Sequence, residues 1–342
     1  MNRRIQARAG SASIPLVVLG GPASASRAAL LQRVLTRNDG RHVAVVHDAS
    51  SMVAIDPAFV ERVDGGACVL RTGAVCYAVE GDASAALAEL RSATVPVECV
   101  VLEAGDGSSF QRTSGYAYMP GYRPGGTVLA TDAATIVSEL EDPPIDESVL
   151  AKELARAELV VLDGAVAASS TTRRSIRRWL LDHARRARIV ECESGCVPTA
   201  MLLGIGPSRT PAHTRLGEWT PRLSLEGDAR RHGTTPPRHD DDYRAWLLTV
   251  RGSIDAREFR DWASALPESI LRGDGELHLR GEDRRGFRFH LCGTRWTLTP
   301  EESAPEHEHG WIALVGLSPP TRPSPPGTPA SSIVEHPDPS AR

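Results

Sequence analysis

Lysine is almost absent from this chain of 342 residues: Lys152 is the only one, and nearly all of the 39 basic side chains are arginines. Any chemistry that needs a lysine therefore has a single candidate. Long apolar runs are also missing. Runs such as Ile14–Gly20 fall far short of the roughly 20 residues that a membrane-spanning helix needs, and no apolar core of signal-peptide length lies near the N-terminus. We expect a cytoplasmic protein without a membrane segment.

Neither sign of charge is in excess. The 39 basic and 43 acidic side chains give a formal net charge of -4, so global electrostatics provides no argument for a nucleic-acid partner. Aromatic residues make up only 5%, but 41% of the residues are hydrophobic, which excludes disorder throughout and indicates about two domains. The six cysteines are scattered along the chain, which favours free thiols over a disulfide framework.

The first two hundred residues alternate between two patterns. Apolar runs ended by polar or glycine residues predict buried strands at 14–20, 41–46, 98–102, 127–130, 159–162 and 188–190. Leucines and valines at helical spacing, or helical composition, predict helices at 26–37, 147–158 and 176–187. This alternation is typical of an α/β domain with a mostly parallel sheet and helices on both faces, which we place at residues 13–206.

The composition changes after this region. Residues 207–242 are rich in Pro, Arg, His, Gly and Asp and predict a linker. Short strands are then predicted at 246–250, 275–279, 286–291, 294–298 and 311–317, with a helix at 256–266. They indicate a small α+β domain with an antiparallel sheet over 243–317. Many Pro and Ser residues and few apolar ones at 318–342 predict a disordered tail.

The turn after the first strand is where an α/β protein binds phosphate, because amides at a helix N-terminus point at the anion. A phosphate-binding loop has the form G-x-x-x-x-G-K-[ST], in which the lysine neutralises phosphate and the hydroxyl holds magnesium. This chain keeps Gly21 at the first glycine, but it has Ser26 at the second, Arg27 at the lysine and Ala28 at the hydroxyl position. The residues that would neutralise phosphate and hold magnesium are both changed.

The residues around the loop resemble a known family. The segments that carry the likeness are IPLVVL at 14–19, Leu30 with Leu31, RHVAVVHD at 41–48, GAVCY at 73–77, VVLE at 100–103, TDAA at 131–134, AELVVLD at 157–163, GCVP at 195–198 and LRG at 271–273 with Trp296 and Trp311. In this order and spacing they are similar to the CobW-type P-loop GTPases, of the CobW/HypB/UreG group. The resemblance implies a P-loop NTPase-like domain, the family's small C-terminal domain, and a GTP-dependent metallochaperone for zinc or cobalt.

The resemblance also designates candidate nucleotide-binding residues: Gly21, Ser24, Ser26, Arg27, Ala28, Asp48, Glu103 and Asp163. Arg27 either meets a phosphate through its planar guanidinium or lies on the helix surface. Ser24 and Ser26 either donate to phosphate or cap the helix. Asp48 and Glu103 are possible cation ligands, but Ala28 makes a conventional magnesium site improbable.

The guanine-reading Asn-Lys-x-Asp of the family is Asp-Gly-Ala-Val at 163–166, so guanine specificity is unsupported. The altered motifs do not support GTP and magnesium as cofactors, and we assign no catalytic residue.

Metal-binding candidates are few. The family's Gly-Cys-x-Cys-Cys motif retains only its middle thiol, Cys76, with Ala74 and Tyr77 at the flanking positions. Cys68 is eight residues away, which is not motif spacing. His307 and His309 alternate with glutamates, a suitable pattern for a weakly bound divalent ion. The alternatives are a semi-buried thiol and a solvated polar loop.

Three hypotheses follow. The first is a CobW-like binding or regulatory protein in zinc or cobalt homeostasis, with a degenerate nucleotide site, little or no hydrolysis, and a client metalloprotein bound through the C-terminal domain. The second is a magnesium-dependent nucleotide hydrolase in which Arg27 replaces the lysine. The third is a metal-free scaffold that binds another protein. None of them involves nucleic acid or a membrane.

Overall fold

The computed structural model describes residues 13–22, 24–38, 40–50, 53, 55–64, 67–93, 97–105, 110–142, 148–204, 243–282, 285–301, 309–317 and 333–336. The predicted linker at 207–242 lies outside these residues, so the domain boundaries drawn there remain predictions. Most of the predicted tail at 318–342 lies outside them as well, but four of its residues form the strand β16 (Ile333–His336). Among the described residues, no helix is long and apolar enough to cross a membrane.

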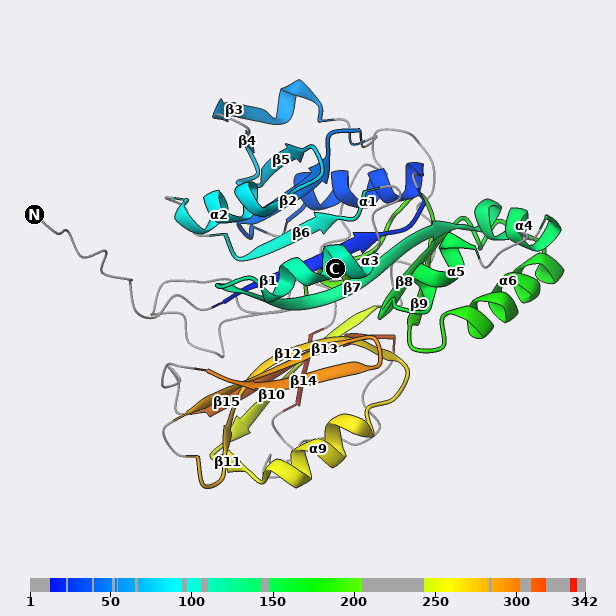
Figure 1. Ribbon diagram of the computed structural model, residues 1–342. Helices are drawn as coiled ribbons and strands as arrows, with labels where there is room; N and C mark the ends of the chain where they lie inside the picture. The colour runs from blue at the N-terminus through cyan, green and yellow to red at the C-terminus, as the bar shows by residue number, and fades with distance from the viewer. Residues whose placement is uncertain are drawn as a thin grey trace, which may run out of the picture.

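The first part of the chain forms a nine-stranded sheet in the order β3-β4-β5-β2-β6-β1-β7-β8-β9 (Figure 1). The strands are β1 (Ile14–Gly20), β2 (Val43–Asp48), β3 (Val60–Asp64), β4 (Ala67–Leu70), β5 (Val75–Val79), β6 (Cys99–Glu103), β7 (Tyr122–Asp132), β8 (Leu159–Asp163) and β9 (Arg188–Cys192). Neighbours from β5 to β9 pair in parallel, whereas β3, β4 and β5 pair antiparallel at one edge. The predicted mostly parallel sheet is confirmed.

Helices cover both faces of this sheet. They are α1 (Ala25–Thr36), α2 (Ser84–Ser92), α3 (Phe110–Ser114), α4 (Ala133–Glu141), α5 (Val149–Leu154), α6 (Ser170–His183) and α7 (Thr199–Leu203), with the short 3-10 turns η1 (Pro57–Phe59) and η2 (Gly115–Tyr118). Alternate residues of β1 belong to different cores: Val17 packs with α1 and α7, and Leu16 with α2 to α6. Because side chains alternate across a strand, a strand covered on both faces is apolar throughout, as β1 is.

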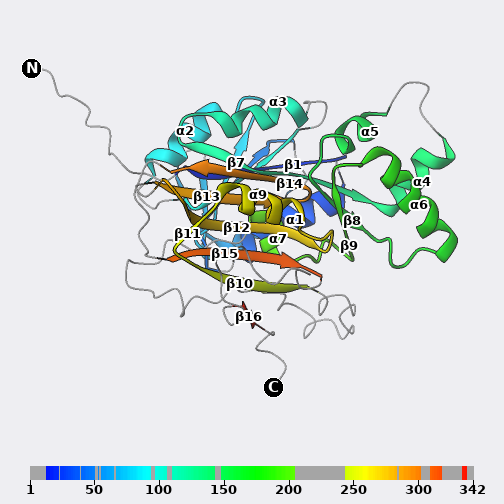
Figure 2. The same ribbon diagram turned by 90° about the horizontal axis from the view of Figure 1, so that it is seen from below.

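The second part of the chain is a separate antiparallel sheet in the order β14-β13-β12-β15-β10-β16, to which β11 adds beside β12 (Figure 2). Its elements are β10 (Arg244–Arg251), β11 (Ser253–Ile254), α9 (Ala256–Ser264), β12 (Ile270–Leu279), β13 (Gly286–Cys292), β14 (Arg295–Pro300) and β15 (His309–Gly316). Phe259 and Trp262 of α9 pack on Phe289 and cover one face of the sheet. The predicted small α+β domain is present.

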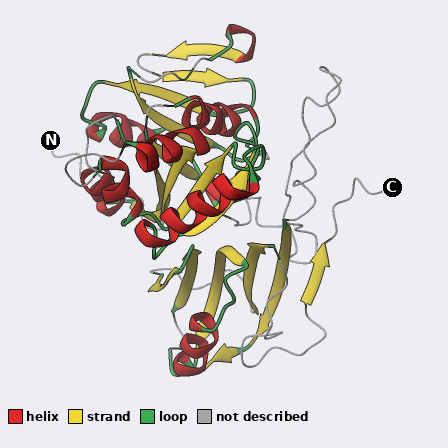
Figure 3. Cartoon of the chain, turned by 90° about the vertical axis from the view of Figure 1, so that its right-hand side faces the viewer, coloured by secondary structure: helices red, strands yellow, loops and turns green. Residues whose placement is uncertain are grey.

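The other face of the second sheet packs against the first domain (Figure 3). Arg272 of β12 is 0% exposed and fixes this junction. Its Nε donates to the carbonyl of Met201 at 2.7 Å, its Nη2 to Leu202 at 2.8 Å and its Nη1 to Gly125 at 2.7 Å. Carbonyls at a helix C-terminus carry partial negative charge, so the guanidinium holds α7 and β7 together against β12.

Candidate nucleotide site

The loop after β1 is held against a neighbouring strand. Gly21 has a φ of +115°, and a Cβ at this position would lie 2.0 Å from the carbonyl oxygen of Ala130 on β7. Only glycine tolerates both this backbone conformation and this approach. The first glycine of the phosphate-loop pattern is therefore required by the path of the backbone itself.

The two serines of the loop have different roles. Ser24 is the N-cap of α1, and its hydroxyl accepts from the amide of Arg27 at 3.3 Å. Ser26 lies in the first turn of α1, where its hydroxyl donates to Oδ2 of Asp163 at 2.8 Å. Asp163 ends β8 and is 9% exposed, and its Oδ1 accepts a weak hydrogen bond from the thiol of Cys192 at 3.9 Å. The start of α1 is thus tied to the ends of β8 and β9.

The side chain of Arg27 points into the protein. The residue is 4% exposed, in contrast to the helix-surface alternative. Its Nε forms an ion pair with Oε1 of Glu103 at 2.9 Å, and its Nη1 donates to the carbonyl of Gly21. Charge-assisted hydrogen bonds of this kind are among the strong ones. The guanidinium at the phosphate-loop lysine position is therefore bonded to the protein's own groups.

Glu103 links this pair to a third element. It ends β6, and its Oε2 accepts from the backbone amide of Asp48 at the end of β2, at 3.2 Å. The carboxylate of Asp48 accepts in turn from the hydroxyl and the amide of Ser50, and these two hydrogen bonds lower the pKa of Asp48. A continuous network thus runs from Gly21 through Arg27 and Glu103 to Asp48. Ser50 and Cys192 were not among the predicted nucleotide-binding residues.

These residues do not fit a complex of GTP and magnesium. The phosphate-loop cation is paired with Glu103, the Ser26 hydroxyl is bonded to Asp163, and Ala28 offers no hydroxyl to a metal ion. Asp163, at the base-reading position, is bonded inside the loop region.

The described residues do not form a zinc centre. Cys76 is 2% exposed, and burial raises the pKa of its thiol to about 12. Cys68 lies opposite Cys76 in the β4–β5 pairing, a proximity that the hairpin creates and the sequence spacing conceals. Zinc requires three or four ligands, and no group of three or more His, Cys, Asp or Glu side chains in the described residues is placed to hold a metal. His307 lies outside the described residues, and the side chain of His309 is not described.

Comparison with known proteins decides the family. The model of the CobW/HypB/UreG nucleotide-binding domain matches residues 15–191. The chain belongs to this family. The predicted membership of the CobW/HypB/UreG family and the predicted P-loop NTPase-like fold are thereby confirmed.

Solved structures show distant likeness. The Zn(II)-bound YjiA GTPase from E. coli is 15% identical, with a TM-score of 0.43 over 90% of this chain and 95% of that one. The hydrogenase maturation factor HypB from Archaeoglobus fulgidus is 15% identical, with a TM-score of 0.34 over 53% of this chain and 81% of that one. No curated protein sequence matches the chain.

Proposed function

We propose that this CobW/HypB/UreG family member is a binding or regulatory protein that works without GTP hydrolysis, because its own Arg27–Glu103 ion pair takes the place of the contact between loop cation and phosphate. The observation that carries the proposal is the burial of both partners: their side chains are 5% and 0% exposed, and the nitrogen and oxygen are 2.9 Å apart. A lysine or arginine that served phosphate would need its donors directed at the ligand.

The energy of this pair sets the size of the effect. For Arg27 to reach a phosphate, it must leave Glu103, and breaking a buried ion pair costs roughly 3–5 kcal/mol. Each factor of ten in affinity corresponds to about 1.4 kcal/mol. A nucleotide that such a loop would otherwise bind at micromolar concentration is therefore bound roughly 100- to 4,000-fold more weakly, with a Kd between about 0.1 mM and a few millimolar. Hydrolysis lacks a cation and a magnesium ligand at the position where charge develops.

The ligand side of the proposal is zinc or cobalt, with a client metalloprotein that docks on the C-terminal domain. Family membership supports it, as do the alternating glutamates and histidines at 306–309, since imidazole suits both metals. The Cys68–Cys76 pair contributes at most two thiols and does not form the site alone.

The experiment restores the loop. We expect no binding of a fluorescent GTP analogue with magnesium to the unmodified protein at micromolar concentration. The variant Ser26→Gly/Arg27→Lys/Ala28→Thr combined with Glu103→Gln should gain affinity, and the matched control Arg33→Lys, in the last turn of α1, should not. Tight nucleotide binding by the unmodified protein, lost in Arg27→Ala, would refute the proposal and favour a nucleotide hydrolase.

The metal is tested separately. Protein treated with a chelator and then dialysed should take up zinc or cobalt at a fixed stoichiometry, without nucleotide, and His307→Ala/His309→Ala should reduce this uptake. Failure to take up either metal would refute the metal part of the proposal and leave a metal-free scaffold.

A further inference from the structure

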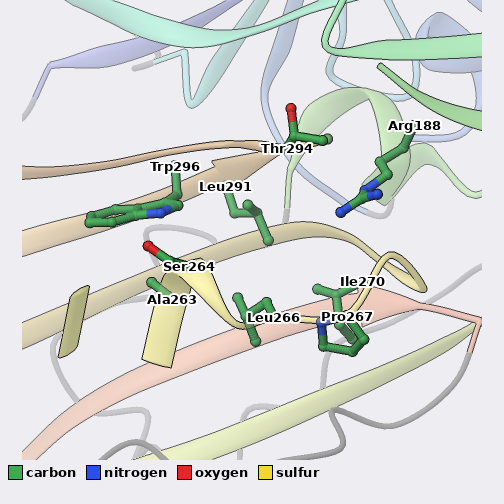
Figure 4. A pocket seen from close by; sticks show the side chains of 10 residues that line it. Arg188, Ala263, Ser264, Leu266, Pro267, Ile270, Leu291, Thr294 and Trp296 are labelled. Carbon is green, nitrogen blue, oxygen red and sulfur yellow. The ribbon is translucent and has the colours of Figure 1, made fainter. Parts of the chain in front are cut away.

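A pocket of about 250 Å³ lies where the two domains meet, between the C-terminal end of α9, the turn between β13 and β14, and the start of β9. The residues that line it lie far along the chain from the loop after β1. Its walls include Arg188, Ser264, Leu266, Leu291, Thr294 and Trp296 (Figure 4). No residue of this pocket belongs to the site described above.

The turn between β13 and β14 builds the pocket's contact with the first domain. Gly293 has a φ of +57°, and a Cβ there would lie 1.7 Å from the carbonyl oxygen of Glu158. The next residue, Thr294, donates its hydroxyl hydrogen to the carbonyl of Arg186 at 2.6 Å. The turn is thus seated on the edge of the first domain, and the hydroxyl of Thr294 has only acceptor capacity left for a ligand.

Six of the ten residues that line the pocket have apolar or aromatic side chains. In the view of Figure 4, Leu291 lies between the indole of Trp296 and the guanidinium of Arg188, and Leu266 lies below Leu291. Trp296 is partly buried and packs edge-on against Phe259 at 6.2 Å between ring centroids, so its plane is fixed. A flat apolar body can stack on such a ring.

The one cationic group among these walls is only partly satisfied. Arg188 enters from β9, and its Nη1 pairs at 3.1 Å with Glu268, whose side chain is 92% exposed. The Nε of Arg188 is buried and has no hydrogen-bond partner among the described residues. Figure 4 shows the guanidinium directed across the pocket towards Leu291 and Ile270.

We propose that this pocket binds a small carboxylic acid with an apolar or aromatic body. The carboxylate would accept from the terminal nitrogens of Arg188, whose planar guanidinium matches a carboxylate, while the body lies between Trp296 and Leu291. Because the side chain of Glu268 is 92% exposed and such surface pairs contribute little, the ligand's carboxylate can replace it at the guanidinium. A single guanidinium favours a monoanion over a phosphate dianion. The volume is below the roughly 300 to 1,000 Å³ of typical ligand pockets, so the acid is small.

This ligand would couple the two domains. Arg188 belongs to the first domain, whereas Ser264, Leu291 and Trp296 belong to the second. An acid that contacts both binds only when the domains are docked, and it therefore stabilises that arrangement by mass action.

Calorimetric titration of the full chain tests the proposal, with hydrocinnamate, benzoate, indoleacetate and hexanoate as probes. At least one acid should bind with one-to-one stoichiometry, and its alcohol counterpart should bind at least tenfold more weakly. Arg188→Gln should also lose at least tenfold in affinity, whereas the matched control Arg186→Gln should not, because Arg186 is exposed and its bond to the turn is made by its backbone carbonyl. The indole N–H signal of Trp296 in the NMR spectrum, identified by its loss in Trp296→Phe, should shift when the acid is added to the unmodified protein.

A second variant keeps the test valid if Arg188→Gln does not fold. Ser264 is exposed at the pocket wall, so Ser264→Phe should fold normally and abolish binding by filling the space. The proposal is overturned if none of the acids binds at millimolar concentration, if acid and alcohol bind equally, or if Ser264→Phe leaves the affinity unchanged.

Discussion

Because Arg27 and Glu103 form a buried ion pair, we expect their contributions to stability to be strongly coupled. We also expect the two single replacements to differ in cost. Replacing Glu103 by leucine leaves a guanidinium in the interior that cannot lose its charge, and we expect this to lower the free energy of unfolding by about 3–5 kcal/mol. Replacing Arg27 by methionine should cost less. The carboxylate of Glu103 would still accept from the backbone amide of Asp48 at 3.2 Å, and it can also take up a proton. The double variant should lie within about 1 kcal/mol of the unmodified protein, since apolar residues of similar volume often replace a buried ion pair without loss.

Urea unfolding followed by far-ultraviolet circular dichroism measures the four free energies of this double-mutant cycle. The coupling energy should be at least about 2 kcal/mol. The exposed pair of Arg177 and Glu191, with nitrogen and oxygen 2.6 Å apart and the arginine side chain 59% exposed, provides the matched control. Its coupling should stay below about 1 kcal/mol, as is usual for surface pairs. Additive effects at Arg27 and Glu103, with a coupling no larger than that of the control, would refute the interpretation of this pair as a closed, buried unit.

Three further predictions concern other parts of the molecule. Arg272→Met should destabilise the protein by about 3–5 kcal/mol, because three carbonyls lose a charged donor; an unchanged urea midpoint would contradict the role of Arg272 at the junction. The thiol of Cys76, whose pKa burial raises to about 12, should react with iodoacetamide much more slowly than Cys68, as mass spectrometry of the labelled peptides would show; equal rates would count against its burial. Burial alone would raise the pKa of Asp274, but the charge and hydrogen bond of His290 at 2.9 Å, together with the charges of Arg123 and Arg272, outweigh it, so the pKa lies below the usual value. Its stabilising contribution is therefore present above the unfolded-state pKa of about 4 and lost as the pH falls through the lower folded-state value. Asp274→Asn should flatten the loss of stability in acid, and an identical acid profile would exclude this contribution.

The sequence predicted six of the seven described strands of the first sheet that pair in parallel, because such strands are near-continuous apolar runs that need no partner to be recognised, but it missed β5. It did not predict the antiparallel edge of β3 and β4, where short, partly exposed strands lack a clear alternation of apolar residues. Helix ends also differed. The helix expected at 176–187 begins at Ser170, because Ser169 caps it by accepting from the amide of Thr172 at 3.1 Å. Side-chain capping decided the boundary where apolar spacing was uninformative.

The sequence indicated which residues lie near the loop after β1, but it did not predict the bonds between them. Order along the chain placed Asp48 and Glu103 at the ends of neighbouring strands, which is where a crevice forms in an open α/β sheet. It did not reveal that Arg27 would pair with Glu103, since an arginine at a lysine position carries no information about which way the guanidinium turns. The distance of 2.9 Å between them depends on the register of β1 with β6, in which Leu19 lies beside Glu103. Such a contact between residues far apart in sequence emerges only from the fold.

We propose that the ion pair of Arg27 and Glu103 replaces the contact with phosphate. Calorimetric titration of the unmodified chain with a nonhydrolysable GTP analogue and magnesium tests this directly. We expect no heat of binding at micromolar concentration for this analogue or for its ATP counterpart. Micromolar binding that disappears in Arg27→Ala would contradict it, because the guanidinium would then have left Glu103 to serve the nucleotide.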